Sequence, residues 1–158
     1  MFREMLRIRQ ALSREECIEV LQTVPRGVLS VKGEDGYPYG MPMNFWYDPE
    51  KDRIYFHGGM KGHKIDALKA DDRVSFCCYD EGFRRPDEWA LNIRSVIIFG
   101  RVRFLEDQDL AMEVSRKLSY RFTKDEAYID EEVRRSGPRT LCFELIPEHM
   151  TGKLVNES

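Results

Sequence analysis

The sequence predicts a mainly β fold in which helices are inserted between the strands of a closed or split antiparallel barrel. Six or so apolar or β-branched runs have the length of strands, and turn residues separate them. The connections between the early strands are too short for the crossover helices that parallel strands need. No linker, repeat or low-complexity stretch divides the 158 residues, so we expect one domain over residues 1–158.

The first half of the chain alternates strands with turns. Ser13 and Glu16 form a capping box, which predicts a helix that ends at about Thr23. Glycine-rich and Asp-Pro segments mark two turns, at 33–36 and 48–52. The strands expected around these turns are 27–31, 39–47 and 53–57, and a short helix is expected at about 64–70.

The second half contains the longest predicted strand. Residues 80–94 carry Gly82, Pro86 and alternating charges, which predict a loop. The β-branched run 95–105 follows, and Gly100 within it is expected to form a bulge or bend that curves a barrel. The other expected elements are strands at 74–79 and 140–146, a helix at 107–120 capped by Asp107, and a small exposed helix at about 126–134.

Composition argues against two classes of partner. The chain carries 28 acidic and 25 basic residues, so its net charge gives no support to nucleic-acid binding. No apolar run approaches the roughly 20 residues that a membrane-spanning helix needs, and the start lacks an apolar stretch of signal-peptide length. We therefore expect a cytoplasmic protein with no nucleic-acid partner and no membrane partner.

The cysteines and histidines predict neither a disulfide nor a metal site. The four cysteines form no C-x-x-C pair, and the adjacent Cys77 and Cys78 should point to opposite faces of a strand. The three histidines show no H-x-x-x-H spacing. We expect Cys17, Cys77, Cys78 and Cys142 to be small buried apolar side chains.

Residues 39–47 alternate between two faces that are both largely apolar or aromatic. Pro42 lacks a backbone donor, so it indicates an interruption or a sheet edge, where free backbone groups can meet a flat ligand. A barrel strand with one face in the core and the other in an oligomer interface explains the pattern equally well, and the two interpretations are compatible. One face carries Tyr39, Met41, Met43, Phe45 and Tyr47, and the other carries Gly40, Pro42, Asn44 and Trp46.

The segment 54–68 has the order strand, glycine-rich loop and helix, which can build an anion site. Glycines let the backbone approach a ligand, and free N–H groups at a helix start carry a partial positive charge. Lys64 adds a full charge in the first helical turn. The spacing matches neither the P-loop nor the dinucleotide-binding fingerprint. An ordinary strand–loop–helix connection with a solvated lysine is the alternative.

Several stretches together resemble the FMN-binding split-barrel superfamily related to pyridoxamine 5′-phosphate oxidase, and within it the nitroimidazole-resistance branch. The resemblance covers nearly the whole chain, and the order and separation of the stretches carry it. It implies a six-stranded antiparallel split β-barrel of the FMN-binding type, and a homodimer with FMN at its interface. The matching stretches are 41–47, 54–58, 62–68, 72–76, 95–102 and 145–153.

The resemblance also assigns roles to individual residues. It places the FMN phosphate near Gly62, His63 and Lys64. It places the isoalloxazine ring along the backbone of residues 41–45, where Asn44 adds a side-chain contact. His57 matches a histidine that the branch places at the flavin, so it is the candidate catalytic residue on the substrate side; a structural histidine at a strand end is the alternative. The other implied cofactor-binding residues are Met41, Pro42, Met43, Phe45, Phe56 and Gly58.

Two departures from the family pattern affect what is expected. The chain does not match the arginine-containing C-terminal segment with which pyridoxamine 5′-phosphate oxidases grip pyridoxal phosphate, so that specific oxidase activity is not expected. It also carries His63-Lys64 where many relatives carry Arg-Lys, which predicts that phosphate affinity depends on pH through His63.

The favoured function is an FMN-dependent oxidoreductase. The flavin would carry electrons from a nicotinamide or other donor to a small acceptor such as a nitroaromatic. Two alternatives belong to other classes: a flavin- or haem-binding module without turnover, and an interaction protein that has lost the cofactor. Flavin colour separates the oxidoreductase and the binding module from the interaction protein. Bleaching of that colour by a nicotinamide separates the oxidoreductase from the binding module.

Overall fold

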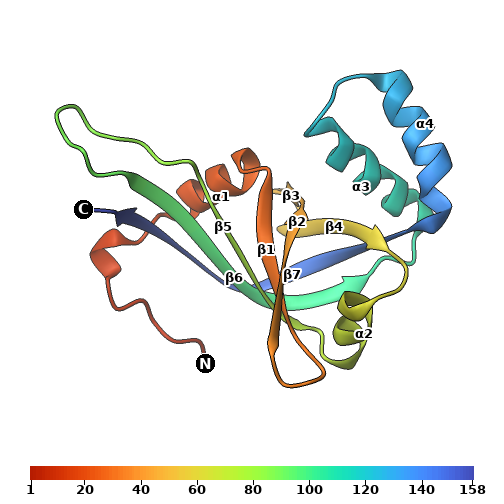
Figure 1. Cartoon of the computed structure of the whole chain (residues 1–158), viewed down its shortest axis with the longest axis horizontal. Coiled ribbons are helices and arrows are strands. Elements are labelled where there is room, and N and C mark those ends of the chain that lie inside the picture. The colour runs from red at the N-terminus through yellow and green to blue at the C-terminus, as the bar shows by residue number, and fades with distance from the viewer.

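A computed structural model describes residues 1–158 and shows seven antiparallel strands that form one strongly curved sheet (Figure 1). The strand order across the sheet is β2-β1-β5-β6-β7-β4-β3. The strands are β1 (Arg26–Lys32), β2 (Pro38–Asn44), β3 (Trp46–Asp48), β4 (Arg53–Gly59), β5 (Arg73–Tyr79), β6 (Asn92–Phe104) and β7 (Thr140–Asn156). The helices are η1 (Ile8–Gln10), α1 (Arg14–Thr23), α2 (His63–Ala70), α3 (Gln108–Tyr120), α4 (Glu126–Ser136) and η2 (Gly137–Arg139).

The mainly β architecture with inserted helices is confirmed, with seven strands in place of six. The extra strand arises because the single strand expected over 39–47 is divided at Phe45. Its two parts, β2 and β3, lie at opposite edges of the sheet, so the chain crosses from one edge to the other at this residue. The expectation that Pro42 marks an interruption or an edge is confirmed, since β2 is an edge strand.

Local capping chemistry determines where two helices begin. The Ser13 backbone N–H donates to Glu16 Oε1 at 3.0 Å, and the Glu16 N–H donates to Ser13 Oγ at 3.1 Å, which completes the predicted capping box of α1. Asp107 likewise accepts hydrogen bonds from the first turn of α3. The buried stripe of α1 is Cys17, Val20 and Leu21, and Ile18 is partly covered.

The longest strands, β6 and β7, pair from Asn92 opposite Asn156 to Phe104 opposite Phe143. The register shifts between Phe99 and Gly100, which confirms the predicted bulge. A Cβ at Gly100 would lie 2.3 Å from the backbone oxygen of Ile146, so only glycine allows the two strands to approach this closely. Both strands extend beyond their predicted limits, β6 by three residues at its start and β7 by ten at its end.

The concave side of the sheet encloses the main core, at whose centre four phenylalanine rings meet. Phe76 lies edge-on to Phe45 and Phe56 at centroid distances of 4.9 and 5.4 Å, and Phe56 stacks on Phe143 at 5.2 Å. A smaller cluster packs α3 against the opposite face of β4 and β7 through Tyr55, Val114, Leu118 and Cys142. β4 and β7 therefore each have one face toward each cluster.

The prediction of buried cysteines holds for three of the four, and Cys77 is the exception. All four are free thiols; Cys17, Cys78 and Cys142 are buried and Cys77 is half-buried. Cys77 and Cys78 face opposite sides of β5, with only Cys78 in the core. Burial raises the pKa of each thiol, so the reactive thiolate is scarce at neutral pH.

Arg121, at the end of α3, holds the chain where β2 passes into β3. Its guanidinium donates to the Phe45 carbonyl oxygen and, at 2.6 Å, to the Val24 carbonyl oxygen, and it lies 4.7 Å above the Phe45 ring. Burial lowers its pKa. The sequence offered no motif for this contact, because the three residues are far apart along the chain.

Replacing Arg121 by methionine is expected to lower the free energy of unfolding by about 1–3 kcal/mol. The variant keeps most of the side-chain volume but leaves two carbonyls of buried residues without their donor. Urea unfolding of the apoprotein measures this change. The control is Arg116→Met on the same helix, which breaks only exposed ion pairs with Asp130 and Glu126 and should unfold like the wild type. Equal free energies of unfolding for Arg121→Met and Arg116→Met would show that the Arg121 contact with the two carbonyls is not stabilising.

Candidate functional site

The predicted site residues from three segments converge on the Lys64 ammonium group. Lys64 Nζ lies 3.8 Å from the Met43 sulfur on β2. A Cβ added at Gly58 on β4 would lie 2.8 Å from the same nitrogen, so a side chain there would displace the lysine. The structure thus brings Met43, Gly58 and Lys64 together from β2, β4 and the start of α2 (Figure 1).

Lys64 carries a half-buried charge without a carboxylate partner. No Asp or Glu oxygen lies within 4.0 Å of its nitrogen, and its only polar contact is the Met43 sulfur. Burial lowers its pKa, because the charged form loses hydration that nothing replaces. An ammonium in this condition favours binding of an anion, which would restore the lost electrostatic stabilisation.

The loop before Lys64 leaves backbone donors available. Gly62 precedes the first residue of α2 with φ of 128°, a conformation that side-chain-bearing residues rarely adopt. No side chain caps the helix, so its first N–H groups keep their partial positive charge. His63 is exposed and stacks on Tyr39 with ring centroids 4.2 Å apart, which ties the loop to β2.

The predicted residues on β2 divide between core and surface. Met43 is buried, Met41 is partly covered, and the facing set Gly40, Pro42 and Asn44 is exposed or half-exposed. Phe45 is fully buried in the core, so only its backbone could contact a ligand. The outer edge of β2 has no neighbouring strand and presents the backbone of residues 41–44.

The aromatic residues after β2 are covered within the chain. Tyr47 is buried, and Trp46 stacks on Tyr55 at 5.3 Å beneath α3. The exposed apolar surface lies elsewhere, on β1 and β6, where Val28, Ile97 and Phe99 are each about 40 % exposed. Both faces of this segment are apolar as the alternation indicated, and α3 covers Trp46 on the face for which an oligomer interface was one interpretation.

His57 lies on the opposite face of β4 from the Lys64 contact at Gly58. It borders a hollow of about 490 Å³ between the end of β4 and the end of α4. Burial lowers the pKa of His57, and the positive charge of Lys64 lowers it further. The imidazole is therefore neutral at neutral pH. Phe56, next to it, is a core residue that could contact a ligand only through its backbone.

Arg135 and Arg139 also line the His57 hollow, and sequence reasoning did not identify them. They lie in or next to a charged segment whose pattern predicted only an exposed helix. No motif could have found them, because their position beside His57 depends on the pairing of β7 with β4, in which Thr140 lies opposite Gly59.

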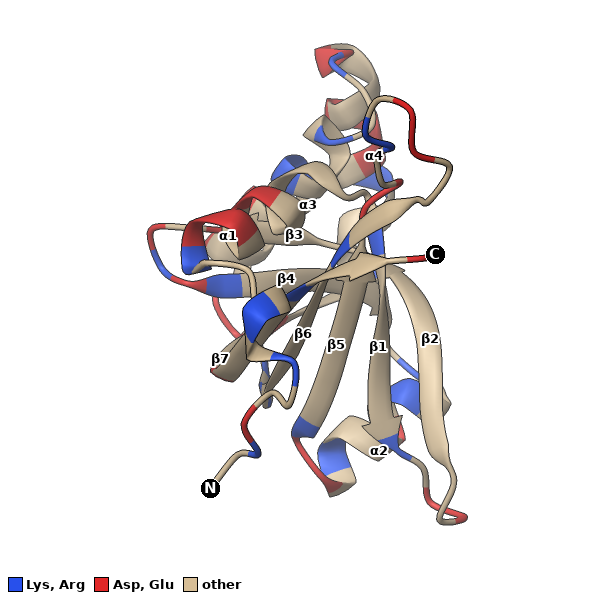
Figure 2. Cartoon of the chain, turned by 90° about the vertical axis from the view of Figure 1, so that its left-hand side faces the viewer, with Lys and Arg blue, Asp and Glu red and all other residues tan.

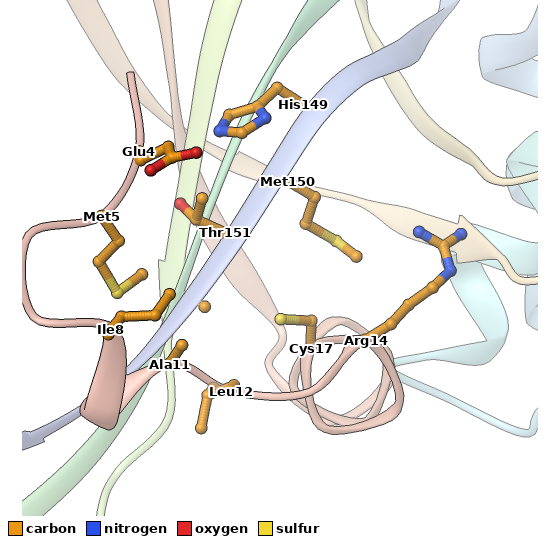
Figure 3. A pocket seen from close by; sticks show the side chains of 11 residues that line it. Glu4, Met5, Ile8, Ala11, Leu12, Arg14, Cys17, His149, Met150 and Thr151 are labelled. Atoms are coloured by element: carbon orange, nitrogen blue, oxygen red, sulfur yellow. The ribbon is translucent and has the colours of Figure 1, made fainter. Parts of the chain in front are cut away.

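Two other cavities lie away from the predicted site residues. One of about 570 Å³ separates the N-terminal segment from β7 and is lined by Met5, Ile8, Cys17 and His149, among others (Figure 3). Another of about 470 Å³ lies beneath α3 and α4 and includes Met112 and Cys142. None of the predicted cofactor-binding residues lines either cavity. No helix of the chain is both long and apolar enough to cross a membrane.

Comparison with known families gives one match that spans most of the chain. The family described as pyridoxamine 5′-phosphate oxidase matches residues 13–154. No curated protein sequence matches the chain.

Solved structures share the fold at low sequence identity. A candidate 5-nitroimidazole antibiotic resistance protein from Bacteroides thetaiotaomicron is 23 % identical, with 92 % of this chain and 87 % of that chain covered and a TM-score of 0.77. An FAD-binding protein from Mesorhizobium loti is 24 % identical, with coverages of 92 % and 97 % and a TM-score of 0.65. An FAD- and heme-binding protein from Mycobacterium smegmatis is 22 % identical, with coverages of 94 % and 74 % and a TM-score of 0.73.

Proposed function

Since the chain belongs to the pyridoxamine 5′-phosphate oxidase family, we propose that it is an FMN-dependent oxidoreductase that reduces small acceptors such as nitroaromatics. Electrons would come from a nicotinamide or another donor. The bound flavin would supply the redox chemistry, and the protein would supply binding, orientation and proton handling.

The unpaired Lys64 ammonium is the observation that carries this proposal. A flavin mononucleotide ends in a single phosphate, and Lys64 with the uncapped N–H groups of α2 provides matching donors. Gly58 and Gly62 add no side chains that would fill the space beside these donors. The residues present therefore fit a terminal phosphate at this point of the fold.

The remaining site residues have separate roles in the proposal. The free backbone edge of β2 at residues 41–44 would hydrogen-bond the polar rim of the flavin ring, with Asn44 adding its side-chain amide. Phe45 and Phe56 support that edge from the core. His57, neutral at neutral pH, would accept or return a proton on the substrate side.

The proposal includes a homodimer with FMN at its interface. Val28, Cys77 and Ile97 form one continuous row across β1, β5 and β6, and Phe99 lies in the next row. The strands β1 and β5 carry Lys or Arg only at their ends (Figure 2). Exposed apolar rows of this kind favour a second protein surface, and a second copy of the chain supplies a matching one.

Replacing Ile97 by lysine is expected to convert the dimer to a monomer and to weaken FMN binding with it. A charge in the centre of an apolar interface leaves two buried cations facing each other across the two-fold axis. Sedimentation velocity at micromolar concentration measures the change. Met112→Lys on α3, at a position 50 % exposed and outside this face, is the control that should remain dimeric. A monomeric wild type that still binds FMN tightly would contradict the dimer.

The redox part of the proposal is tested by anaerobic reduction. We expect NADH or NADPH to bleach the flavin of the reconstituted protein without added reductase, and a nitroaromatic to restore the colour. A bound flavin that neither donor reduces would favour a binding module without turnover. Absence of flavin binding would favour a protein that has lost the cofactor.

A further inference from the structure

The hollow beside His57 differs from the other cavities because no apolar side chain lines it. Its walls are the end of β4, the end of α4, η2 and the start of β7. The residues that line it are His57, Gly58, Gly59, Arg135, Ser136, Arg139 and Thr140. A volume of about 490 Å³ lies within the range of small-molecule sites.

The positive charge of this hollow is only partly neutralised within the chain. Arg135 donates to Glu132 Oε2 at 2.8 Å, and the other oxygen of Glu132 accepts from the Ser136 hydroxyl at 3.0 Å. These two contacts lower the pKa of Glu132, the Ser136 bond having the larger effect. Arg139, by contrast, forms no hydrogen bond and no ion pair with a carboxylate. One guanidinium therefore remains free to bind a ligand.

The usual role of arginines at the end of a helix does not explain Arg139. Cations in the last turn stabilise a helix, and this explains Arg134 and Arg135. Arg139 lies beyond α4, in η2, and it lines the same hollow as the candidate catalytic histidine. Its guanidinium offers a planar set of donors that matches carboxylate and phosphate oxygens.

We propose that this hollow is a subsite for an oxyanion group of the substrate, a carboxylate or a phosphate. Arg139 binds the anion, with support from Arg135, and so places the rest of the substrate next to His57. This inference rests on the proposed function, because it assigns the substrate class of the same site. It predicts that anionic aromatic acceptors are preferred over neutral ones of similar size.

Calorimetric titration with benzoate and with phenyl phosphate tests the subsite without requiring turnover. The probes share an aromatic ring and differ in the anion, so they separate a carboxylate site from a phosphate site. FMN affinity is measured independently, by quenching of flavin fluorescence. Titrating the FMN-loaded protein reports on the substrate subsite, and FMN titration alone reports on the proposed function.

Arg139→Gln is expected to weaken binding of the preferred probe by about 10- to 100-fold, because one charge-assisted contact is lost. Arg139→Lys should retain part of the affinity, since the charge is kept but the planar donor set is not. Arg134→Gln is the matched control: Arg134 lies in the last turn of α4, is paired with Glu131 and borders the neighbouring apolar cavity. Probe binding by the control, and FMN affinity in all three variants, should equal those of the wild type.

Three results would overturn the inference. The first is no binding of either probe by a wild-type protein that binds FMN, which leaves the proposed function intact. The second is weaker FMN binding in Arg139→Gln, because the hollow would then hold the cofactor phosphate. The third is probe binding to a protein that binds no flavin, which removes the substrate role and the proposed function together. Arg134 and Arg139 are both exposed, so the variants at these positions should fold. Thermal unfolding checks this.

Discussion

His57→Ala is expected to slow reduction of a small acceptor by about 10²–10⁴-fold per bound flavin, while most FMN binding is retained. The physical reason is that a positioned imidazole can exchange a proton as the flavin changes charge. Turnover divided by the amount of bound FMN is the quantity to measure, with several nitroaromatic and quinone acceptors. Unchanged normalised turnover, with stability and cofactor lost together, would instead make His57 a structural residue.

The pH dependence of this rate carries a second test of the same residue. Burial and the charge of Lys64 lower the pKa of His57, so its protonated form accumulates only below the usual range near 6.5. A step that needs the protonated imidazole should therefore accelerate as the pH falls through this lowered pKa. In Lys64→Met at saturating FMN, loss of the positive charge should move the transition to higher pH, and His57→Ala should abolish it.

Lys64→Met is expected to weaken FMN binding by about 10- to 150-fold, the loss associated with one charge-assisted hydrogen bond. The apoprotein should be at least as stable as the wild type. Because burial lowers the pKa of Lys64, its ammonium disfavours folding at neutral pH until an anion binds, and methionine removes that penalty. Fluorescence titration with FMN and urea unfolding measure the two effects separately.

Lys61→Met provides the control for Lys64. Lys61 lies in the same glycine-rich loop but is exposed, so its charge is screened by water. We expect it to change FMN affinity far less than Lys64→Met. Equal FMN affinity in Lys64→Met and the wild type would remove Lys64 from the phosphate site, and with it the main support for the proposed cofactor.

Features encoded in adjacent residues could be predicted from the sequence. Ser13 with Glu16, Asp107 and Gly100 each act over a few positions, and the structure has a capping box, a helix cap and a bulge at these places. Among the predicted site residues, the order strand, glycine loop and helix brought Gly58 and Lys64 together as expected. Their roles in binding a flavin remain predictions.

Features that depend on distant parts of the chain could not be predicted. Residues 39–47 are divided at Phe45, whose carbonyl binds Arg121 from 76 positions away along the chain. The end of β7 has no strand-like pattern of its own and is held by pairing with β6 from Asn92 to Gly100, of which only the first three residues were unexpected. Arg139 lines the same hollow as His57 only because β4 and β7 are neighbours. In each case a tertiary contact determined the outcome, which periodicity cannot reveal.

The absorbance spectrum of the freshly purified protein tests the central claim most directly. We predict the two visible bands of oxidised flavin, and we predict that the pigment released by heat is FMN, whose fluorescence does not rise after phosphodiesterase treatment. A rise would identify FAD, because cleavage separates its flavin from the adenine that quenches it. A colourless protein that also fails to acquire these bands when incubated with FMN would contradict the account.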